Sequence, residues 1–214
     1  MRLRKKPWIS EALDEYGDLV YRGEVSQFQG RWRELFGRSG PLHVELGTGK
    51  GRFISEMAKA FPNIDFIGIE AQQDVLYYAA QKVAAGELSN VRLLVFDINN
   101  ILEIFAPAEI SRLYINFCDP WPKSRYGKRR LTHRRFLDMY KQLLAPGGEI
   151  HFKTDNRDLF DFSLTECTDQ GWRVEQVTYD LHNSVYAVGN VMTEYEMKFS
   201  ASGPIHRLCA HWPS

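Results

Sequence analysis

The sequence predicts an α/β protein with a mostly parallel sheet, and three observations carry this prediction. Short apolar runs that end in an acid or a glycine alternate with segments of helical spacing from about residue 42 onward. The connections between them are short, which is typical of strands joined by crossover helices. The final part holds two extended patterns, at 172–181 and 193–199, without a helical pattern between them. We therefore expect a seven-stranded sheet with helices on both faces and an antiparallel C-terminal hairpin.

The composition limits the class of protein. A chain of 214 residues with 44% hydrophobic and 25% charged residues suits one globular domain. The three cysteines are widely spaced and the histidines lack metal-ligand spacing, so we expect no metal and a reducing, cytoplasmic setting. No apolar run is long enough for a membrane span, so we expect no membrane partner.

Two parts are expected: a basic, helical N-terminal arm at 1–40 and the main domain at 41–214. In the arm, Ser10 and Ser26 are predicted to cap two helices, the second ending near Gly37. A basic cluster at the N-terminus could bind an anionic partner; its residues are Arg2, Arg4, Lys5 and Lys6.

The main domain alternates between the two patterns until its C-terminal hairpin. Seven strands are expected, at residues 42–47, 66–70, 91–98, 112–117, 149–154, 172–181 and 193–199. Helices are expected at 53–61, 73–85, 132–144 and 156–168. Thr132 is the predicted cap of the third helix, which Pro146-Gly147-Gly148 is expected to end.

The segment ELGTGKG, Glu45–Gly51, joins the first strand to a helix. Its glycines permit a tight turn and close approach of a ligand to the backbone. Arg52 stands where the dinucleotide fingerprint needs its third glycine, and the spacing of a P-loop is absent. The segment therefore predicts either a plain strand-to-helix turn or a site for a ligand without a pyrophosphate.

Acids at the ends of the first three strands favour a ligand site over a plain turn. These acids are Glu45, Glu70 and Asp97. Their position is informative because open sheets of this class bind ligands at the carboxyl ends of their strands. Glu70 could bind ribose hydroxyls and Asp97 an adenine edge, although each could also be a solvated strand end or a helix cap. S-adenosylmethionine fits this pattern, because it carries adenosine and a positive sulfonium but no phosphate.

The stretch NFCDPWPKSRYGKRRLTHRR, residues 116–135, combines one acid with many cations. Prolines on both sides of Trp121 stiffen the loop that carries Asp119. The loop could hold a carboxylate and an indole ready for a substrate, or could pack Trp121 into the core. The seven cations are Lys123, Arg125, Lys128, Arg129, Arg130, Arg134 and Arg135. The last two begin a helix, where cations oppose the helix dipole unless an anionic partner offsets it.

Six segments together resemble the bacterial tRNA (guanine-N7-)-methyltransferases, the TrmB family: ELGTGKG, GIE, NFCDPWPK, RRLTH, HFKTDN and TEYE. The resemblance covers nearly the whole chain. It implies a Rossmann-like, class I S-adenosylmethionine-dependent methyltransferase fold. It also implies methyl transfer from S-adenosylmethionine to N7 of a guanosine in the variable loop of tRNA.

The resemblance assigns roles to particular residues. The cofactor contacts that we expect are Glu45, Gly47, Thr48, Gly49, Glu70, Asp97 and Asp119, and Asp119 also has the catalytic role. The expected substrate contacts are Lys123, Asp155, Thr193, Glu194, Tyr195 and Glu196. RNA interaction is expected at Arg125, Tyr126, Gly127, Lys128, Arg129 and Arg130.

Several alternatives stay open. The fold could serve a methyltransferase acting on another RNA or on a small molecule, and a non-enzymatic RNA-binding protein is a third possibility. We expect tRNA as the partner rather than DNA. The sequence leaves open which tRNAs are accepted, whether the chain is a monomer or a homodimer, and whether Asp119 contacts mainly guanine or the cofactor.

Overall fold

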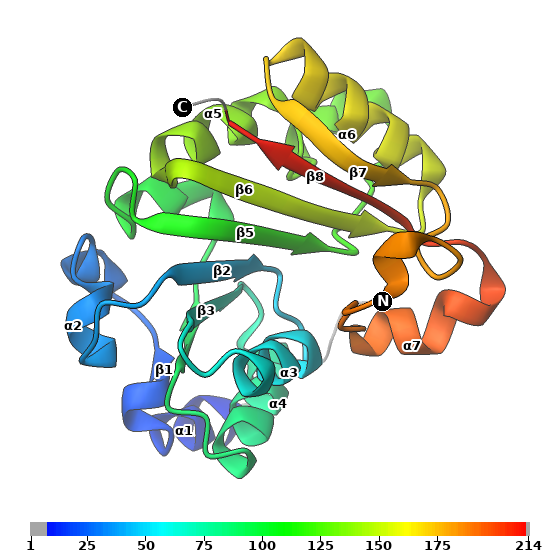
Figure 1. The fold of residues 1–214 in the computed structure, drawn as a ribbon. Coiled ribbons are helices and arrows are strands. Elements are labelled where there is room, and N and C mark those ends of the chain that lie inside the picture. The colour runs from blue at the N-terminus through cyan, green and yellow to red at the C-terminus, as the bar shows by residue number, and fades with distance from the viewer. Residues whose placement is uncertain (1–7, 213–214) are drawn as a thin grey trace. The chain divides into compact units, whose positions relative to one another are not determined.

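The computed structural model describes residues 8–212, which belong to two compact units (Figure 1). Unit 1 extends to Ile104, and unit 2 begins at Phe105. The described residues contain eight strands, four in each unit, which is one more than predicted. The additional strand is the two-residue β1, Val20–Tyr21, in the predicted N-terminal arm. The basic cluster at Arg2–Lys6 lies outside the described residues.

Unit 1 contains a parallel sheet with the strand order β1-β4-β3-β2. Its three longer strands are β2, Leu42–Leu46, β3, Asp65–Glu70, and β4, Val91–Val95. All five residues of β2 and the first five of β3 are buried. Continuous burial is expected of a parallel sheet covered on both faces, and explains why most residues of these strands are apolar.

Two helices of unit 1 follow the strands as the sequence predicted. They are α3, Arg52–Ala60, and α4, Gln73–Ala85, and both contact β3 and β4. The predicted bounds of α4 are confirmed, and Gly86 ends it. Figure 1 shows both helices beside the sheet, in cyan and green.

The described part of the predicted arm belongs to the core of unit 1. Helix α1, Trp8–Asp14, packs on α4 and buries Ile9 and Leu13. Helix α2, Trp32–Phe36, buries Trp32, whose indole N–H donates a hydrogen bond to the carbonyl of Ile104 at 2.7 Å. These residues therefore help to complete the fold of unit 1.

Two capping predictions in the arm are wrong. Ser10 lies inside α1 and does not cap it. Ser26 lies in a short 3-10 helix, η2, Val25–Phe28, and a separate helix starts at Trp32. Gly30, with a φ of 75°, interrupts the expected continuous helix, because a left-handed residue cannot continue it. Gly37 ends α2 in the left-handed conformation, as predicted. A further 3-10 helix, η1, Gly17–Leu19, precedes β1.

Unit 2 contains a mixed sheet with the strand order β5-β6-β8-β7. The first two strands, β5, Ile110–Asn116, and β6, Leu144–Thr154, are parallel. Strand β8, His206–His211, is antiparallel to both β6 and β7, Arg173–Thr178. Helices α5, Arg134–Leu143, and α6, Arg157–Asp169, lie on one face of this sheet in Figure 1.

The predicted strand at 193–199 is a helix. Helix α7, Glu194–Phe199, begins after Thr193, whose hydroxyl accepts a hydrogen bond from the Glu196 N–H at 3.0 Å. The spacing Thr-x-x-Glu is the sequence signature of a helix N-terminus, whereas the alternating polarity of the segment favours a strand. The second C-terminal strand is β8, which the sequence pattern does not predict. A 3-10 helix, η5, Val185–Ala187, precedes α7 and another, η6, Ser200–Ser202, follows it.

The start of α5 also differs from the prediction. His133 is its N-cap, and its Nδ1 atom accepts a hydrogen bond from the Arg135 N–H at 3.1 Å. Thr132 is buried instead, 2.7 Å from the Ser163 hydroxyl on α6. The predicted terminator Pro146-Gly147-Gly148 lies inside β6, after a helix that already ends at Leu143. This stretch coincides with a register shift between β5 and β6.

Two expectations drawn from composition can be compared with the structure. The three cysteines are free thiols, and burial raises the pKa of Cys167 to about 12, which keeps it protonated near neutral pH. Within residues 8–212, no helix combines the length and apolar character needed to cross a bilayer.

Gly51 should be essential to the packing of unit 1. Its φ is 80°, and an added Cβ would lie 2.6 Å from the Cβ of Ala79 on α4. Gly51→Ala is therefore expected to lose about 3 kcal/mol of unfolding free energy from backbone strain and overpacking together. Urea denaturation followed by circular dichroism measures this loss.

Gly37→Ala is the matched control. Gly37 has a φ of 67°, but an added Cβ would meet no atom within 4 Å. Its loss is expected to be about 1 kcal/mol, from strain alone. Equal losses in the two variants would show that the contact with Ala79 is unimportant.

Candidate functional site

The glycine loop of unit 1 lies between β2 and α3. The N–H groups of Gly47 and Thr48 donate hydrogen bonds to the carbonyl of Ile69 on β3, at 2.8 and 3.0 Å. Gly47 and Gly49 have φ values of 84° and 58°, and an added Cβ at either would meet no atom within 4 Å. The glycines are therefore required by the backbone conformation, and they leave open space above the loop where a ligand can approach.

Gly68 on β3 supports this loop from below, a role that the sequence analysis missed. A Cβ at this position would lie 2.5 Å from the Thr48 hydroxyl oxygen and 2.9 Å from Cδ1 of Ile54. Thr48 is buried, and its hydroxyl donates to the carbonyl of Glu45 at 3.4 Å. The missing side chain at Gly68 thus lets the loop rest directly on the sheet.

The three predicted acids lie at the carboxyl edge of the unit 1 sheet. Glu45 is buried, and its strand neighbour on β3 is Gly68. Glu70 ends β3, and its carboxylate accepts hydrogen bonds from the N–H groups of Gly49, at 3.3 Å, and Gln72, at 3.0 Å. Glu70 therefore braces the glycine loop.

Asp97 follows β4 and caps the 3-10 helix η3, Ile98–Glu103. Its Oδ1 atom accepts a hydrogen bond from the backbone N–H of Asn99 at 2.9 Å. The side chain is exposed. Asp97 is thus a helix cap, which was one of the two roles that the sequence allows. Capping leaves the other carboxylate oxygen and the exposed face of Asp97 accessible.

This edge suits S-adenosylmethionine better than a dinucleotide. Carboxylates can accept hydrogen bonds from ribose hydroxyls and favour a cationic group, but they repel a pyrophosphate. The open glycine loop leaves room for a ligand close to the backbone. Glu45, Glu70 and Asp97 are the residues of unit 1 that would hold the cofactor, and its chemistry would be that of a methyl donor.

In unit 2, the exposed Asp119 lies in the loop after β5, residues 117–123, which we call the Asp119 loop. The backbone on both sides of it is left-handed: φ is 52° at Phe117 and 42° at Trp121. Trp121 is half-buried and does not belong to the core, so the alternative of a core-packed indole is wrong. Its ring lies 5.9 Å from that of Tyr126, edge to face.

The basic stretch, residues 123–135, contains a 3-10 helix, η4, Ser124–Arg129, in which one aromatic residue, Tyr126, stands among three cations. The guanidinium of Arg129 lies over the rings of Trp121 and Tyr126, at 4.8 and 4.9 Å from their centroids. Arg125 lies over the Tyr126 ring at 4.8 Å. The exposed cations between residues 123 and 135 are Lys123, Arg125, Lys128, Arg129 and Arg134. Such a surface suits RNA, because bases stack on rings and phosphates pair with guanidinium groups.

Arg134, at the start of α5, has an internal anionic partner, which the sequence analysis did not foresee. The Glu166 carboxylate on α6 accepts hydrogen bonds from the Arg134 backbone N–H and from its Nη2 atom, both at 2.7 Å. The hydrogen bond from the Arg134 side chain is the main cause that lowers the pKa of Glu166. An RNA phosphate is therefore not needed to offset the cation at this helix start.

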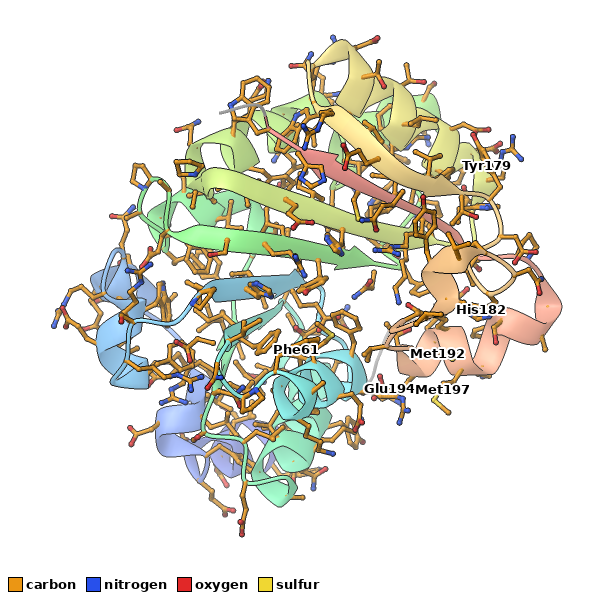
Figure 2. All side chains as sticks on the ribbon, viewed as in Figure 1. Phe61, Tyr179, His182, Met192, Glu194 and Met197 are labelled. Atoms are coloured by element: carbon orange, nitrogen blue, oxygen red, sulfur yellow. The ribbon has the colours of Figure 1, made fainter. Side chains whose placement is uncertain are left out.

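Asp155 and Tyr195, two predicted substrate residues, are brought together. Asp155 is exposed just after β6, and its Oδ2 atom accepts a hydrogen bond from the Tyr195 hydroxyl at 2.9 Å. The Tyr195 ring lies 5.1 Å from that of Phe117, next to the Asp119 loop. Tyr195 is on α7, whose neighbouring residues Glu194 and Met197 are labelled in Figure 2.

Glu196, another predicted substrate residue, lies in a buried network. Its carboxylate is fully buried and pairs with the Lys153 ammonium at 2.7 Å. His182, labelled in Figure 2, and Asn190 also bind it, each at 2.8 Å. Burial favours the protonated acid, but the Lys153 charge and these hydrogen bonds outweigh burial and lower the pKa of Glu196. The network fastens α7 and the preceding loop to β6.

A group of potential metal ligands also forms on unit 2, from Glu149, His151 and Cys209. The sequence pattern does not indicate this group, because β6 and β8 are far apart along the chain. The Glu149 carboxylate already pairs with Arg112 at 2.8 Å and with His151 at 2.5 Å, and the hydrogen bond from His151 is the main cause that lowers its pKa to about 2. Arg207 lies 3.5 Å from the Cys209 sulfur. These nearby cations disfavour a metal ion.

Solved structures of methyltransferases have a similar fold. A 16S rRNA methyltransferase, KamB, matches with a TM-score of 0.67 at 13% identity, covering 86% of this chain and 94% of the other. A SAM-dependent methyltransferase from Aquifex aeolicus matches with a TM-score of 0.56 at 16% identity, over 96% and 93% of the two chains. At this identity the likeness defines the fold class.

The particular family follows from the sequence matches. A family model described as "Putative methyltransferase" matches residues 39–208. A protein named tRNA (guanine-N(7)-)-methyltransferase from Geobacillus sp. (strain WCH70) is 52% identical to this chain, over 100% of this chain and 96% of the other. A protein of the same name from Bacillus subtilis (strain 168) is 48% identical, over 99% of both chains. The chain belongs to this methyltransferase family.

The buried pair Lys153–Glu196 should stabilise unit 2 in a pH-dependent way. Glu196→Gln would leave the Lys153 ammonium buried without a counter-charge, and is expected to cost about 3–5 kcal/mol at neutral pH. Since folding lowers the pKa of Glu196, its contribution is present above the ordinary value of 4.5 and is lost as the pH falls through the lower folded value. Urea denaturation of both proteins between pH 7 and about pH 3 measures the difference.

Lys198→Gln on the exposed side of α7 is the control and should change the unfolding free energy by less than about 0.5 kcal/mol. If the cost of Glu196→Gln stayed constant across the pH series, the ion pair would not be its source.

Proposed function

We propose that this protein transfers a methyl group from S-adenosylmethionine to N7 of a guanosine in tRNA. The observation that carries the proposal is the exposed Asp119 loop with its adjoining cation–aromatic stretch, in a chain about half identical over its whole length to proteins named for this reaction. We place the modified guanosine in the variable loop of tRNA, following the sequence resemblance.

The chemistry requires orientation more than proton transfer. Guanine N7 has a lone pair in the ring plane, so it needs no deprotonation before it attacks a methyl group. S-adenosylmethionine, when bound, supplies that methyl group on a positively charged sulfur. As N7 forms its new bond, the guanine ring becomes positive, so a fixed carboxylate beside the ring stabilises the change.

Asp119 is the carboxylate that best fits this role. It is exposed, and it stands in a loop held by two prolines. A carboxylate can also accept hydrogen bonds from the guanine N1–H and amino group, which would select guanine over adenine. Asp155 and Tyr195 form a second polar group available to the base or to its ribose.

The exposed cations of the basic stretch would bind the tRNA backbone. Arg125 and Arg129 stack on aromatic rings, which leaves the edge of each guanidinium able to pair with a phosphate. N7 is often engaged in tertiary pairing, so the base has to leave its stack before reaction. Trp121 and Tyr126 offer surfaces on which a displaced base could stack.

Other features of the function are proposed on the same basis. We place the reaction in the cytoplasm, with neither DNA nor a membrane as partner, and the chain acting as a monomer or homodimer. Residues 41–214 would form the methyltransferase domain, with residues 1–40 as its basic arm. A methyltransferase of the same fold that modifies another RNA or a small molecule is the alternative, and it would have less use for the basic stretch.

Transfer of a radioactive methyl group to bulk bacterial tRNA tests the function directly. The product is expected to contain 7-methylguanosine, and cleavage at the modified base should locate it in the variable loop. Nuclease-digested tRNA and ribosomal RNA serve as controls. Equal labelling of ribosomal RNA, or of a position other than guanine N7, would overturn the proposal.

Asp119→Ala tests the role of the carboxylate. The single-turnover rate is expected to fall by at least about a hundredfold, because electrostatic stabilisation of the developing charge is lost. Asp169→Ala, an exposed acid in the last turn of α6, should leave the rate unchanged. Calorimetry with S-adenosylmethionine then separates a loss of cofactor affinity from a loss in the chemical step, and a normal rate in Asp119→Ala would exclude the role.

A further inference from the structure

We propose that Arg130 is a positioning residue that holds the Asp119 loop in its reactive conformation, and that it is not one of the RNA-binding cations. This inference rests on the proposed function, in which the Asp119 carboxylate acts on guanine. It separates Arg130 from its neighbour Arg129, although the family resemblance implies RNA interaction for both.

Arg130 binds the loop backbone at two consecutive residues. Its Nε atom donates a hydrogen bond to the carbonyl of Pro120 at 3.0 Å, and its Nη2 atom donates to the carbonyl of Trp121 at 3.1 Å. The rigid fork of a guanidinium can span two acceptors in this way, whereas the single ammonium of lysine cannot reproduce its geometry. Both carbonyls belong to the segment that directly follows Asp119.

A second contact fixes the guanidinium itself. Its central carbon lies 4.3 Å from the centroid of the Phe162 ring on α6. The His133 ring stacks on Phe162 from α5's N-cap, at a centroid distance of 6.3 Å. Arg130 therefore connects the loop to the two helices that pack on the unit 2 sheet, and is itself partly buried.

The loop requires such a connection because its backbone is strained. Phe117 and Trp121 both have positive φ, which costs a non-glycine residue on the order of 1–3 kcal/mol. Within residues 8–212 the Asp119 carboxylate has no hydrogen-bond partner of its own, so the surrounding backbone determines where it points. Without the two bonds from Arg130, the Trp121 residue is free to relax toward negative φ and to displace Asp119.

Arg129 differs from Arg130 in its exposure and in the groups that it contacts, although both guanidinium groups lie over aromatic rings. It is exposed, and its contacts are with the faces of the Trp121 and Tyr126 rings rather than with backbone carbonyls. An arginine stacked on a ring keeps N–H groups for a phosphate. The adjacent pair Arg129 and Arg130 is therefore a matched comparison, with the same residue type at neighbouring positions.

The test measures tRNA affinity and single-turnover methyl transfer separately. Arg130→Ala is expected to lower the rate at saturating tRNA by about a hundredfold, the effect of a misplacement of about 1 Å, while the Kd for tRNA changes less than about threefold. Arg130→Lys retains the charge and should recover little of the rate. Arg129→Ala should show the opposite pattern, with its main effect on the Kd for tRNA and on its salt dependence.

Phe162→Leu tests the same loop independently, because it removes the ring under the guanidinium without replacing Arg130. It should lower the rate, and the double variant with Arg130→Ala should be no slower than Arg130→Ala alone, since both act through one contact. Thermal unfolding of each variant identifies any that fail to fold. If Arg130→Ala does not fold, the rate and tRNA affinity of Arg130→Lys decide the question.

The outcomes distinguish this inference from the function on which it rests. If wild-type protein does not methylate tRNA at guanine N7, the proposed function fails. If Asp119→Ala abolishes methyl transfer but Arg130→Ala weakens only tRNA binding, Arg130 is an RNA contact and the inference is overturned. A loss of rate in Arg130→Lys equal to that in Arg130→Ala, with tRNA affinity retained, supports the positioning role.

Discussion

A single constraint recurs in both units: the chain has to turn sharply where a parallel strand ends, and those turns use left-handed backbone. In unit 1 the turn after β2 is made by Gly47, Gly49 and Gly51, for which positive φ costs little. In unit 2 the turn after β5 places positive φ on Phe117 and Trp121, for which it is costly. The glycine turn therefore carries little backbone strain, whereas the strained second turn is held by prolines and by hydrogen bonds from Arg130.

The positive charge between residues 123 and 135 has two physical uses. Arg130 and Arg134 are bound internally, one to loop carbonyls and the other to the Glu166 carboxylate. The exposed Arg125 and Arg129 stack on aromatic rings and remain available to an anionic partner. A chain with zero formal net charge can therefore present a local basic surface without all of those cations being part of it.

Burial distinguishes residues that appear equivalent in the TEYE segment. Tyr195 is exposed and reaches Asp155, while Glu196 next to it is buried against Lys153. Because α7 turns 100° per residue, adjacent side chains face different surroundings. One motif thus supplies both a residue available to a substrate and the anchor that holds the helix in place.

The sequence by itself determined the α/β class, the bounds of α4 and the positions of the acids at strand ends, because local periodicity and turn chemistry depend on neighbouring residues. It did not determine that 193–199 is helical or that 206–211 is a strand, since short segments take their conformation from what they pack against. Only the tertiary structure decided the partners: Glu166 for Arg134, Lys153 for Glu196, and two loop carbonyls for Arg130. Such contacts join residues that are distant in sequence, or depend on the direction in which a side chain points. The sequence composition does not indicate them.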